Sequence, residues 1–147
     1  MKPYHISEQG LELIKEFEGF RAESYYCDAG KKTIGYGHAI KNGEVFTEPM
    51  PPEIAENLLK QDLRWVEKTI NNTVSCDLLQ NEVDALCSLI YNIGGTAFRK
   101  SHLLEYLNNE NYLRAADEFL KWCHIGDQVS NGLLKRRQKE RELFLED

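Results

Sequence analysis

The sequence predicts an α+β fold in which a short first helix leads into a small β region and several helices follow. Helical periodicity stops at Gly19, residues 20–48 are rich in glycine with β-branched and aromatic residues, and prolines precede renewed helical periodicity from residue 52. The chain has 147 residues, 41% of them hydrophobic, which is enough for one domain with its own core.

The first helix is expected over residues 6–17. Ser7 is a suitable N-cap, and apolar residues such as Ile14 recur at three- to four-residue steps up to Glu18. Gly19 ends the pattern, because glycine accepts the positive φ that often closes a helix.

The β region covers residues 20–48. Its composition predicts short strands joined by tight turns, and Asn42-Gly43 predicts a hairpin turn. A long helix over residues 52–71 is expected to follow, with Pro52 in the first turn, where proline is tolerated. The remainder is expected to be helical over 78–91, 99–108, 111–124 and from 132 onward, with a break at Gly94-Gly95 and a loop at 125–131.

The chain is acidic, with a formal net charge of -6 and an isoelectric point of about 5.3. Nucleic-acid binding needs a basic footprint, so the chain is a poor candidate for it. The same charge fits awkwardly with anionic cell-wall polymers. A local basic cluster, Lys135-Arg136-Arg137, remains able to face such a substrate.

The cysteines form no CxxC pair and no Cys/His cluster with zinc spacing, so no metal site is predicted. The N-terminus carries no apolar signal segment, and no stretch is long enough for a transmembrane helix. We therefore expect reduced thiols in a protein made in a cytoplasm, without membrane insertion. The cysteines concerned are Cys27, Cys76, Cys87 and Cys123.

Glu18 has the chemistry that glycoside hydrolysis needs. That reaction uses a proton donor on one side of the bond and a second group on the opposite face. Glu18 ends the first helix directly before the glycine-rich region, a junction that suits the wall of a cleft. Alone this is a weak indication, because a glutamate at a helix end is usually a solvated surface residue.

The spacing after Glu18 strengthens the indication. Cys27 follows after eight intervening residues and Thr33 after five more, and Thr33 opens the run Thr-Ile-Gly-Tyr-Gly-His that ends at His38. This pattern resembles the phage-type lysozymes, glycoside hydrolase family 24, in which an aspartate or a cysteine holds the middle position. The resemblance extends along the chain, through the doublet Ala115-Ala116 to the closing segment that begins at Gly132.

The resemblance implies a two-lobed lysozyme-like fold within one catalytic domain, 1–147. The N-terminal helix and β region, 6–48, would form a small lobe, and the helix 52–71 would join it to a larger helical lobe, 72–147. The catalytic cleft would lie between the lobes.

The resemblance also implies three catalytic roles. Glu18 would protonate the glycosidic oxygen, and Thr33 would hold the attacking water. Cys27 would assist as a base or stabilise positive charge, although a thiol, with an ordinary pKa of about 8.5, is a poor permanent anion. Asp28, the next residue, is the alternative for this role.

Tyr91 and Ser101 match positions that line the substrate groove, and His38, which could also be a base, is a third substrate-binding candidate. Each has a simpler structural explanation. His38 would support the active-site wall through local hydrogen bonds, Tyr91 would belong to the core, and Ser101 would be a helix N-cap. Trp65 and Trp122 are expected to be packing residues first, although either could stack on a sugar.

The implied activity is that of a muramidase, which hydrolyses the β-1,4 bond between N-acetylmuramic acid and N-acetylglucosamine in bacterial peptidoglycan. As an endolysin, the monomeric enzyme would wait in the host cytoplasm until a holin gives it access to the periplasm and cell wall. No cofactor is implied. The alternatives are a lytic transglycosylase that leaves 1,6-anhydro products, a non-catalytic peptidoglycan-binding module, and a bacterial effector with the same chemistry.

Overall fold

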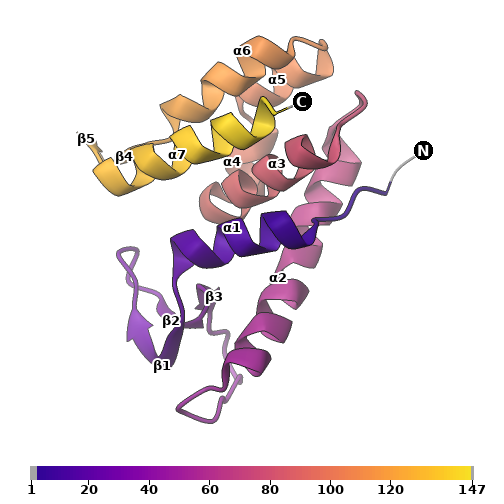
Figure 1. Cartoon of the computed structure of the whole chain (residues 1–147). Coiled ribbons are helices and arrows are strands. Elements are labelled where there is room, and N and C mark those ends of the chain that lie inside the picture. The colour runs from indigo at the N-terminus through magenta and orange to yellow at the C-terminus, as the bar shows by residue number, and fades with distance from the viewer. Residues whose placement is uncertain (1–2, 147) are drawn as a thin grey trace. The chain divides into compact units, whose positions relative to one another are not determined.

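The computed structural model describes residues 3–146, whose contacts divide into two compact units. One unit is Glu12–Trp65, which contains the β region. The other is mainly helical and joins the N-terminal residues through Leu11 to the chain from Val66 onward. Figure 1 shows the element order, in which helices and small antiparallel sheets confirm the α+β class.

The β-containing unit holds a three-stranded antiparallel sheet with the order β1-β2-β3. The strands are β1 (Arg21–Tyr26), β2 (Lys32–Gly35) and β3 (His38–Ala39). The central strand places Thr33 opposite Tyr25 on one side and opposite Ala39 on the other. A small core of Ile34, Met50 and Ala55 lies against the sheet, and Tyr36, Ile40, Phe46 and Leu58 pack around it.

The predicted Asn42-Gly43 hairpin is wrong in part. The turn forms, because the Glu44 amide donates to the Lys41 carbonyl at 3.0 Å and Gly43 has a φ of 88°. However, β3 ends at Ala39, and no described strand follows it before the next helix. The Glu44 carboxylate accepts from the Lys41 amide at 2.7 Å, so side-chain bonds hold this segment in place of a strand ladder.

The first helix and the long helix each belong to both units. They are α1 (Glu8–Glu18) and α2 (Pro52–Thr73), and both occupy nearly the predicted residues. The N-terminal segment before α1 is hydrogen-bonded within the helical unit. The Tyr4 amide donates to Asn71 at 2.7 Å, and the Ser7 amide donates to Asp84 at 2.9 Å.

The helical unit is built around α3 (Gln80–Ile93), along which α7 (Asn131–Phe144) packs. Between them in sequence lie α4 (Gly95–Arg99), α5 (His102–Asn108) and α6 (Tyr112–Glu118). The fully buried side chains of this core include Leu86, Leu89, Ile90, Phe98, Phe119 and Phe144. These helices confirm the predicted helical lobe, although several of their bounds differ.

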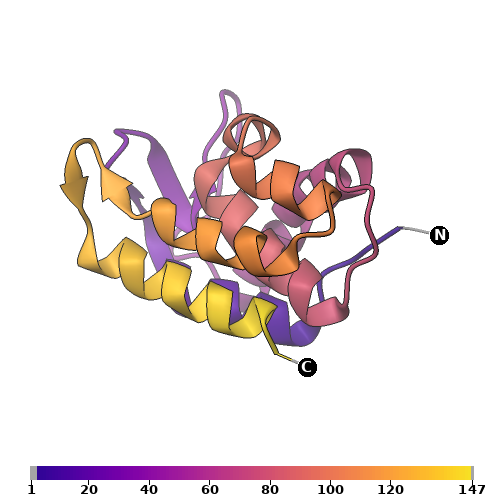
Figure 2. The ribbon, with the colours of Figure 1, turned by 90° about the horizontal axis from the view of Figure 1, so that it is seen from above.

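The segment predicted as a loop over 125–131 contains a short hairpin. Strand β4 (His124–Ile125) pairs with β5 (Gln128–Val129), and Gly126 in the turn has a φ of 61°. Figure 2 shows this hairpin at the beginning of α7. Strands of two residues are too short to produce a recognisable alternation of apolar and polar residues, so the sequence pattern does not reveal them.

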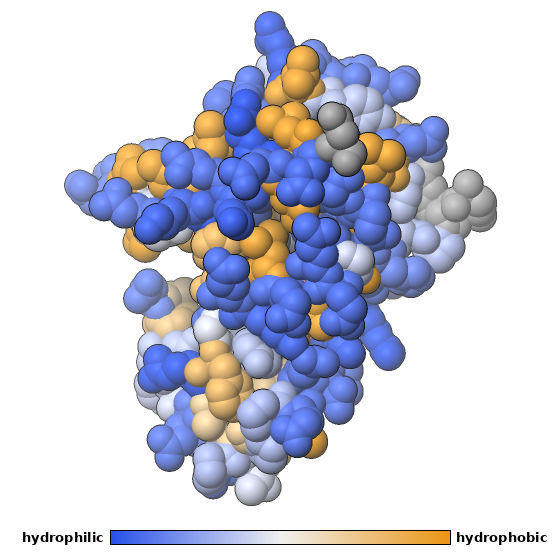
Figure 3. Space-filling model, viewed as in Figure 1, coloured by the Kyte–Doolittle hydropathy of each residue, from blue (hydrophilic) through white to orange (hydrophobic). Residues whose placement is uncertain are grey.

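The face in Figure 3 is mainly hydrophilic, and hydrophobic residues appear on it in separate groups. No helix within residues 3–146 combines the length and the apolarity needed to cross a membrane. All of the cysteines are free thiols, as expected.

Candidate active site

Glu18 is the last residue of α1, at the junction that the sequence predicts. The Gly19 amide donates to the Lys15 carbonyl at 2.9 Å, and Gly19 takes a φ of 72°, so the helix ends and the chain turns into β1. The Glu18 side chain is half-buried. It is thus held at the end of a regular helix and keeps partial access to solvent.

The last turns of α1 are fixed to α2 by Lys15. Its ammonium forms an ion pair with Glu56 of α2 and lies 5.6 Å from the centre of the Tyr36 ring. The hydrogen bond to Glu56 is the main reason that the pKa of Lys15 is raised, against the opposing effect of burial. Because Lys15 lies one turn before Glu18, this contact restrains the part of the helix that carries the acid.

The Lys31 carbonyl brings Cys27 and Thr33 together. It accepts the Cys27 amide at 3.0 Å and the Thr33 hydroxyl at 2.8 Å. Thr33 is 4% exposed, so its hydroxyl is held firmly in the sheet. Since that hydroxyl gives its proton to Lys31, its oxygen remains able to accept a hydrogen bond from another molecule.

The surroundings of Cys27 favour its thiolate. Hydrogen bonds from the backbone at Lys31 and then Ala29 lower the pKa of the Cys27 thiol. Burial opposes these effects only partly. Asp28 is exposed in the turn that follows, whereas Cys27 is half-buried beside Thr33. The geometry therefore groups Cys27, not Asp28, with Thr33.

Tyr25 is a member of this group that the sequence analysis missed. It lies opposite Thr33 across the sheet, and the Arg21 guanidinium lies 4.2 Å from the centre of its ring. Burial and then the negative charge of Glu18 raise the pKa of Tyr25, and Cys27 adds to the effect. The available signal was register, because a cross-strand partner of Thr33 shares its face of the sheet.

His38 is buried and has both ring nitrogens engaged. Nδ1 lies 2.7 Å from Asp62 of α2, and Nε2 lies 2.9 Å from Glu44. Ionised carboxylates only accept hydrogen bonds, so this geometry needs a proton on each nitrogen and hence a charged imidazolium. The bond to Asp62 and then the bond to Glu44 raise the pKa of His38, while burial opposes them. This arrangement favours the supporting role, and a direct contact with substrate stays a prediction.

Replacing His38 with asparagine is expected to lower the free energy of unfolding by about 3 kcal/mol near pH 5.5, because two charge-assisted hydrogen bonds are lost. A raised pKa in the folded state stabilises the protein fully below the unfolded value of about 6.5, and this contribution disappears as the pH rises through the folded value. The difference in unfolding free energy between wild type and His38→Asn should therefore become smaller in alkaline solution. Urea unfolding of both proteins from about pH 5.5 to 9.5 measures it.

His102→Asn is the matched control, since this histidine side chain is 76% exposed. It should change the unfolding free energy by less than about 0.5 kcal/mol over the same pH range. A His38→Asn deficit that does not vary with pH would contradict the charged pairing.

The helical unit contains the other two predicted binding residues. Tyr91 is half-buried in α3. Ser101 is the N-cap of α5, because its hydroxyl accepts from the Leu104 amide at 3.1 Å and donates to the Phe98 carbonyl at 2.7 Å. The capping role of Ser101 is therefore confirmed, and substrate contacts by either residue stay predictions.

The Lys135-Arg136-Arg137 cluster does not form a basic surface, so this expectation is wrong. Arg136 is 5% exposed and Arg137 is fully buried. Their guanidinium groups lie 3.2 and 3.0 Å from the carboxylate oxygens of Glu140, on the same helix. Of the three, only Lys135 is exposed, because Arg136 and Arg137 both lie on the side of α7 that bonds Ser88 and Asn92 of α3.

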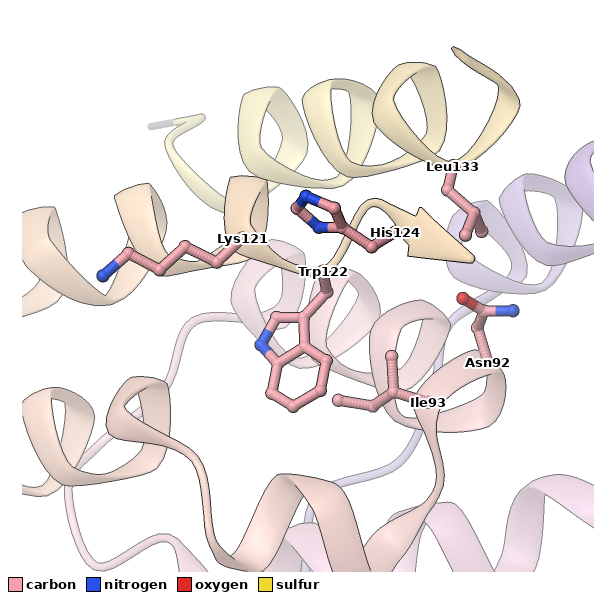
Figure 4. A pocket seen from close by; sticks show the side chains of 6 residues that line it. All are labelled: Asn92, Ile93, Lys121, Trp122, His124 and Leu133. Atoms are coloured by element: carbon pink, nitrogen blue, oxygen red, sulfur yellow. The ribbon is translucent and has the colours of Figure 1, made fainter. Parts of the chain in front are cut away.

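A recess in the helical unit exposes part of an aromatic ring. It has a volume of about 480 Å³. Figure 4 shows the Trp122 indole beside Ile93, while Lys121 extends away from both. Trp122 is half-buried and Trp65 is 42% exposed, so part of each side chain packs against the protein and part remains accessible to solvent. The lining residues are Asn92, Ile93, Lys121, Trp122, His124 and Leu133.

Within residues 3–146, no group of three acidic, histidine or cysteine side chains is placed to hold a metal ion.

The family model described as phage lysozyme matches residues 15–140, which include Glu18, Cys27 and Thr33. The chain belongs to the phage lysozyme family. This phage lysozyme is 44% identical to the endolysin of Acyrthosiphon pisum secondary endosymbiont phage 1 over 146 residues, with 95% of this chain and 97% of that protein covered.

Solved structures agree with this assignment. The crystal structure of P22 lysozyme, a point mutant, has 43% identity and a TM-score of 0.85, with 97% of this chain and 99% of that chain covered. The muramidase domain of SpmX from Asticaccaulis excentricus has 36% identity and a TM-score of 0.89, with 98% and 99% covered. The protein is thus a lysozyme-type enzyme of the endolysin kind, with the lysozyme-like fold that the sequence predicts.

Proposed function

We propose that this lysozyme hydrolyses the β-1,4 bond between N-acetylmuramic acid and N-acetylglucosamine, with Glu18, Cys27 and Thr33 as its catalytic residues. The observation that carries the assignment is the Lys31 carbonyl, which accepts hydrogen bonds from both Cys27 and Thr33 and so holds them side by side. Glu18, at the end of α1, acts electrostatically on Tyr25, the cross-strand partner of Thr33. The chemistry needs no cofactor.

The reaction breaks one bond and forms another. Protonated Glu18 gives its proton to the glycosidic oxygen, so the bond from the anomeric carbon to that oxygen breaks. A water donates a hydrogen bond to the Thr33 oxygen and attacks the anomeric carbon with a free lone pair. The proton that this water loses passes to the Cys27 thiolate. A water positioned on the face opposite the acid gives inversion at the anomeric carbon.

Cys27→Ala is expected to lower kcat about a hundredfold at neutral pH, because it removes a group that bears charge and takes a proton. Cys27→Asp should restore most of the loss. Since the pKa of Cys27 is lowered, wild-type activity should rise with pH as the thiolate forms, starting below the range of an ordinary thiol. The aspartate variant should lose this rise, because its carboxylate is already ionised. Rates of reducing-end release across pH measure both effects.

Asp28→Ala is the matched control, because it removes an exposed carboxylate one residue away. It should change kcat by less than about twofold. If it instead reproduced the loss and Cys27→Ala remained active, Asp28 would be the assisting group.

The mass of the wild-type products separates hydrolysis from the transglycosylase alternative. Hydrolysis adds one water molecule for each glycosidic bond that is cleaved, whereas cleavage to a 1,6-anhydro product adds no water. The two kinds of product therefore differ in mass by one water. We expect reducing ends throughout, because Thr33 offers an acceptor for water. Tight pelleting with peptidoglycan and no product of either kind would support a binding module.

The route to the wall is also part of the proposal. We propose that a monomeric enzyme accumulates in the host cytoplasm and reaches the periplasm through a holin, which fits the free thiols. Coexpression in a bacterial host with and without a holin, followed by culture turbidity, tests the route.

A further inference from the structure

Two cations flank the proposed acid in the sequence, and each has a fixed place in the structure. Lys15 lies three residues before Glu18, and its ammonium forms an ion pair with Glu56 of α2. Arg21 lies three residues after Glu18, and its guanidinium lies 4.2 Å from the centre of the Tyr25 ring. Each of these positive charges is therefore held by a residue other than the acid.

The contact between Arg21 and Tyr25 depends on a bulge in β1. Arg21 lies opposite Gly35 and Tyr25 lies opposite Thr33, so the steps from 21 to 25 on β1 face only the steps from 33 to 35 on β2. A regular strand separates residues four positions apart by about 13 Å, whereas two positions span only about 7 Å. The bulge therefore brings the two side chains close enough to stack.

The bulge is hydrogen-bonded to the segment that precedes α2. The Ser24 amide donates to the Glu48 carboxylate at 2.9 Å, and the Met50 amide donates to the Ala22 carbonyl at 2.8 Å. Met50 belongs to the small core of the β-containing unit. The exposed Arg21 side chain thus stacks on a strand whose irregular part is firmly held.

The Tyr25 side chain lies within electrostatic reach of both the acid and the cation. Burial raises the pKa of Tyr25 most, the charge of Glu18 raises it further, and the charge of Arg21 lowers it. Cys27 and Asp28, which follow β1, also raise it. Because one side chain responds to both charges, a guanidinium released from the ring would remain near enough to act on Glu18.

We propose that the Tyr25 ring acts on the catalytic acid through Arg21: by stacking on the guanidinium, it keeps this positive charge away from Glu18. The inference rests on the proposed function, in which Glu18 must hold a proton at the start of each turnover. A cation within about 4–6 Å of a carboxyl group favours its ionised form, which has no proton to give. An aromatic face suits this purpose, because it holds an arginine without neutralising its charge. Tyr25 is thus a positioning residue that acts through its ring.

Tyr25→Leu removes the ring and releases the guanidinium. We expect the titration of the Glu18 carboxyl to move about one pH unit lower, at the small end of the effect of a neighbouring arginine, because both groups have access to solvent. The kcat/KM for peptidoglycan near neutral pH should fall about tenfold, because one pH unit changes the protonated fraction tenfold. The carboxyl-carbon NMR signal of Glu18, assigned with Glu18→Gln, measures the titration without any substrate.

Two further variants separate the effect of the ring from a general effect on packing. Tyr25→Phe keeps an aromatic face for Arg21, so the titration of Glu18 should stay at the wild-type pH. Arg21→Gln/Tyr25→Leu lacks the guanidinium, so this titration should return to the wild-type pH although the ring is absent. A loss of packing would not be reversed by a second substitution at an exposed residue. If leucine impairs folding, Tyr25→Ile replaces it, because β-branched residues suit a strand.

Tyr106→Leu is the matched control, because Tyr106 is also half-buried and the Arg114 guanidinium lies 5.8 Å from the centre of its ring. It should not move the titration of Glu18. The inference is overturned if Tyr25→Leu causes no shift, if Tyr25→Phe or Tyr106→Leu shifts the titration equally, or if the double variant does not restore it. If wild type does not cleave peptidoglycan, the proposed function fails, and the NMR titrations still decide the role of the ring.

Discussion

Replacing Glu18 with glutamine is expected to lower the rate of peptidoglycan cleavage about a thousandfold, because the amide cannot give a proton to the leaving oxygen. The fold should survive, since the side chain is half-buried and glutamine has nearly the same shape. A carboxylate at the C-terminal end of α1 also opposes the helix dipole, so its removal should not destabilise the helix. Reducing-end release and thermal unfolding of the same preparation measure both effects.

Glu16→Gln is the matched control for this experiment. Glu16 lies two residues earlier on α1 and is exposed, so its replacement removes the same charge without touching the proposed acid. We expect activity within about twofold of wild type. Near-normal cleavage by Glu18→Gln would contradict the assignment, and a large loss in Glu16→Gln would show that charge, not proton transfer, is measured.

Glu140→Gln is expected to produce the largest loss of stability, about 3–5 kcal/mol in the free energy of unfolding. Glu140 is fully buried, and its carboxylate faces Arg136, Arg137 and the hydroxyl of Ser88. Burial raises the pKa of Glu140, while the two guanidinium groups act to lower it. Neutralising the acid leaves two buried cations without their shared counterion. Denaturant unfolding near neutral pH measures the loss.

The exposed Glu142, two residues later on α7, provides the comparison. Glu142→Gln should alter the unfolding free energy by less than about 0.5 kcal/mol. Apolar replacement of Arg136, Arg137 and Glu140 together should recover part of the Glu140→Gln loss, because no buried charge then remains uncompensated. If the single and triple variants were equally unstable, packing and not charge would dominate at this position.

The sequence predicts the elements that depend on local signals. Gly19 and Ser101 illustrate this, because a helix end and an N-cap are decided by residues within one turn. The burial of Arg137 could not be predicted in this way. It depends on α7 packing along α3, which brings Asn92 within hydrogen-bond distance of the guanidinium. A run of basic residues carries no information about which of them face a neighbouring helix.

The candidate site likewise contains residues that a local pattern predicts and a residue whose place depends on strand pairing. The spacing from Glu18 to Thr33 predicts the three catalytic candidates. In the structure, the Cys27 amide and the Thr33 hydroxyl both donate hydrogen bonds to the Lys31 carbonyl. Tyr25 was missed because its pairing with Thr33 can be counted only once the turn between β1 and β2 is located, and the composition of this region predicts short strands without their exact ends.

The N-terminal segment also has a consequence for synthesis on the ribosome. Its hydrogen bonds to Asn71 and Asp84 join residues that are 67 and 77 positions apart in the sequence. The N-terminal segment, which is synthesised first, therefore cannot form these bonds until residues 71 and 84 have left the ribosome. The β-containing unit is one continuous segment, Glu12–Trp65, so it requires no contacts with residues synthesised much later. We therefore expect the β-containing unit to be able to fold on the nascent chain, while the helical unit closes only after release of nearly the whole polypeptide.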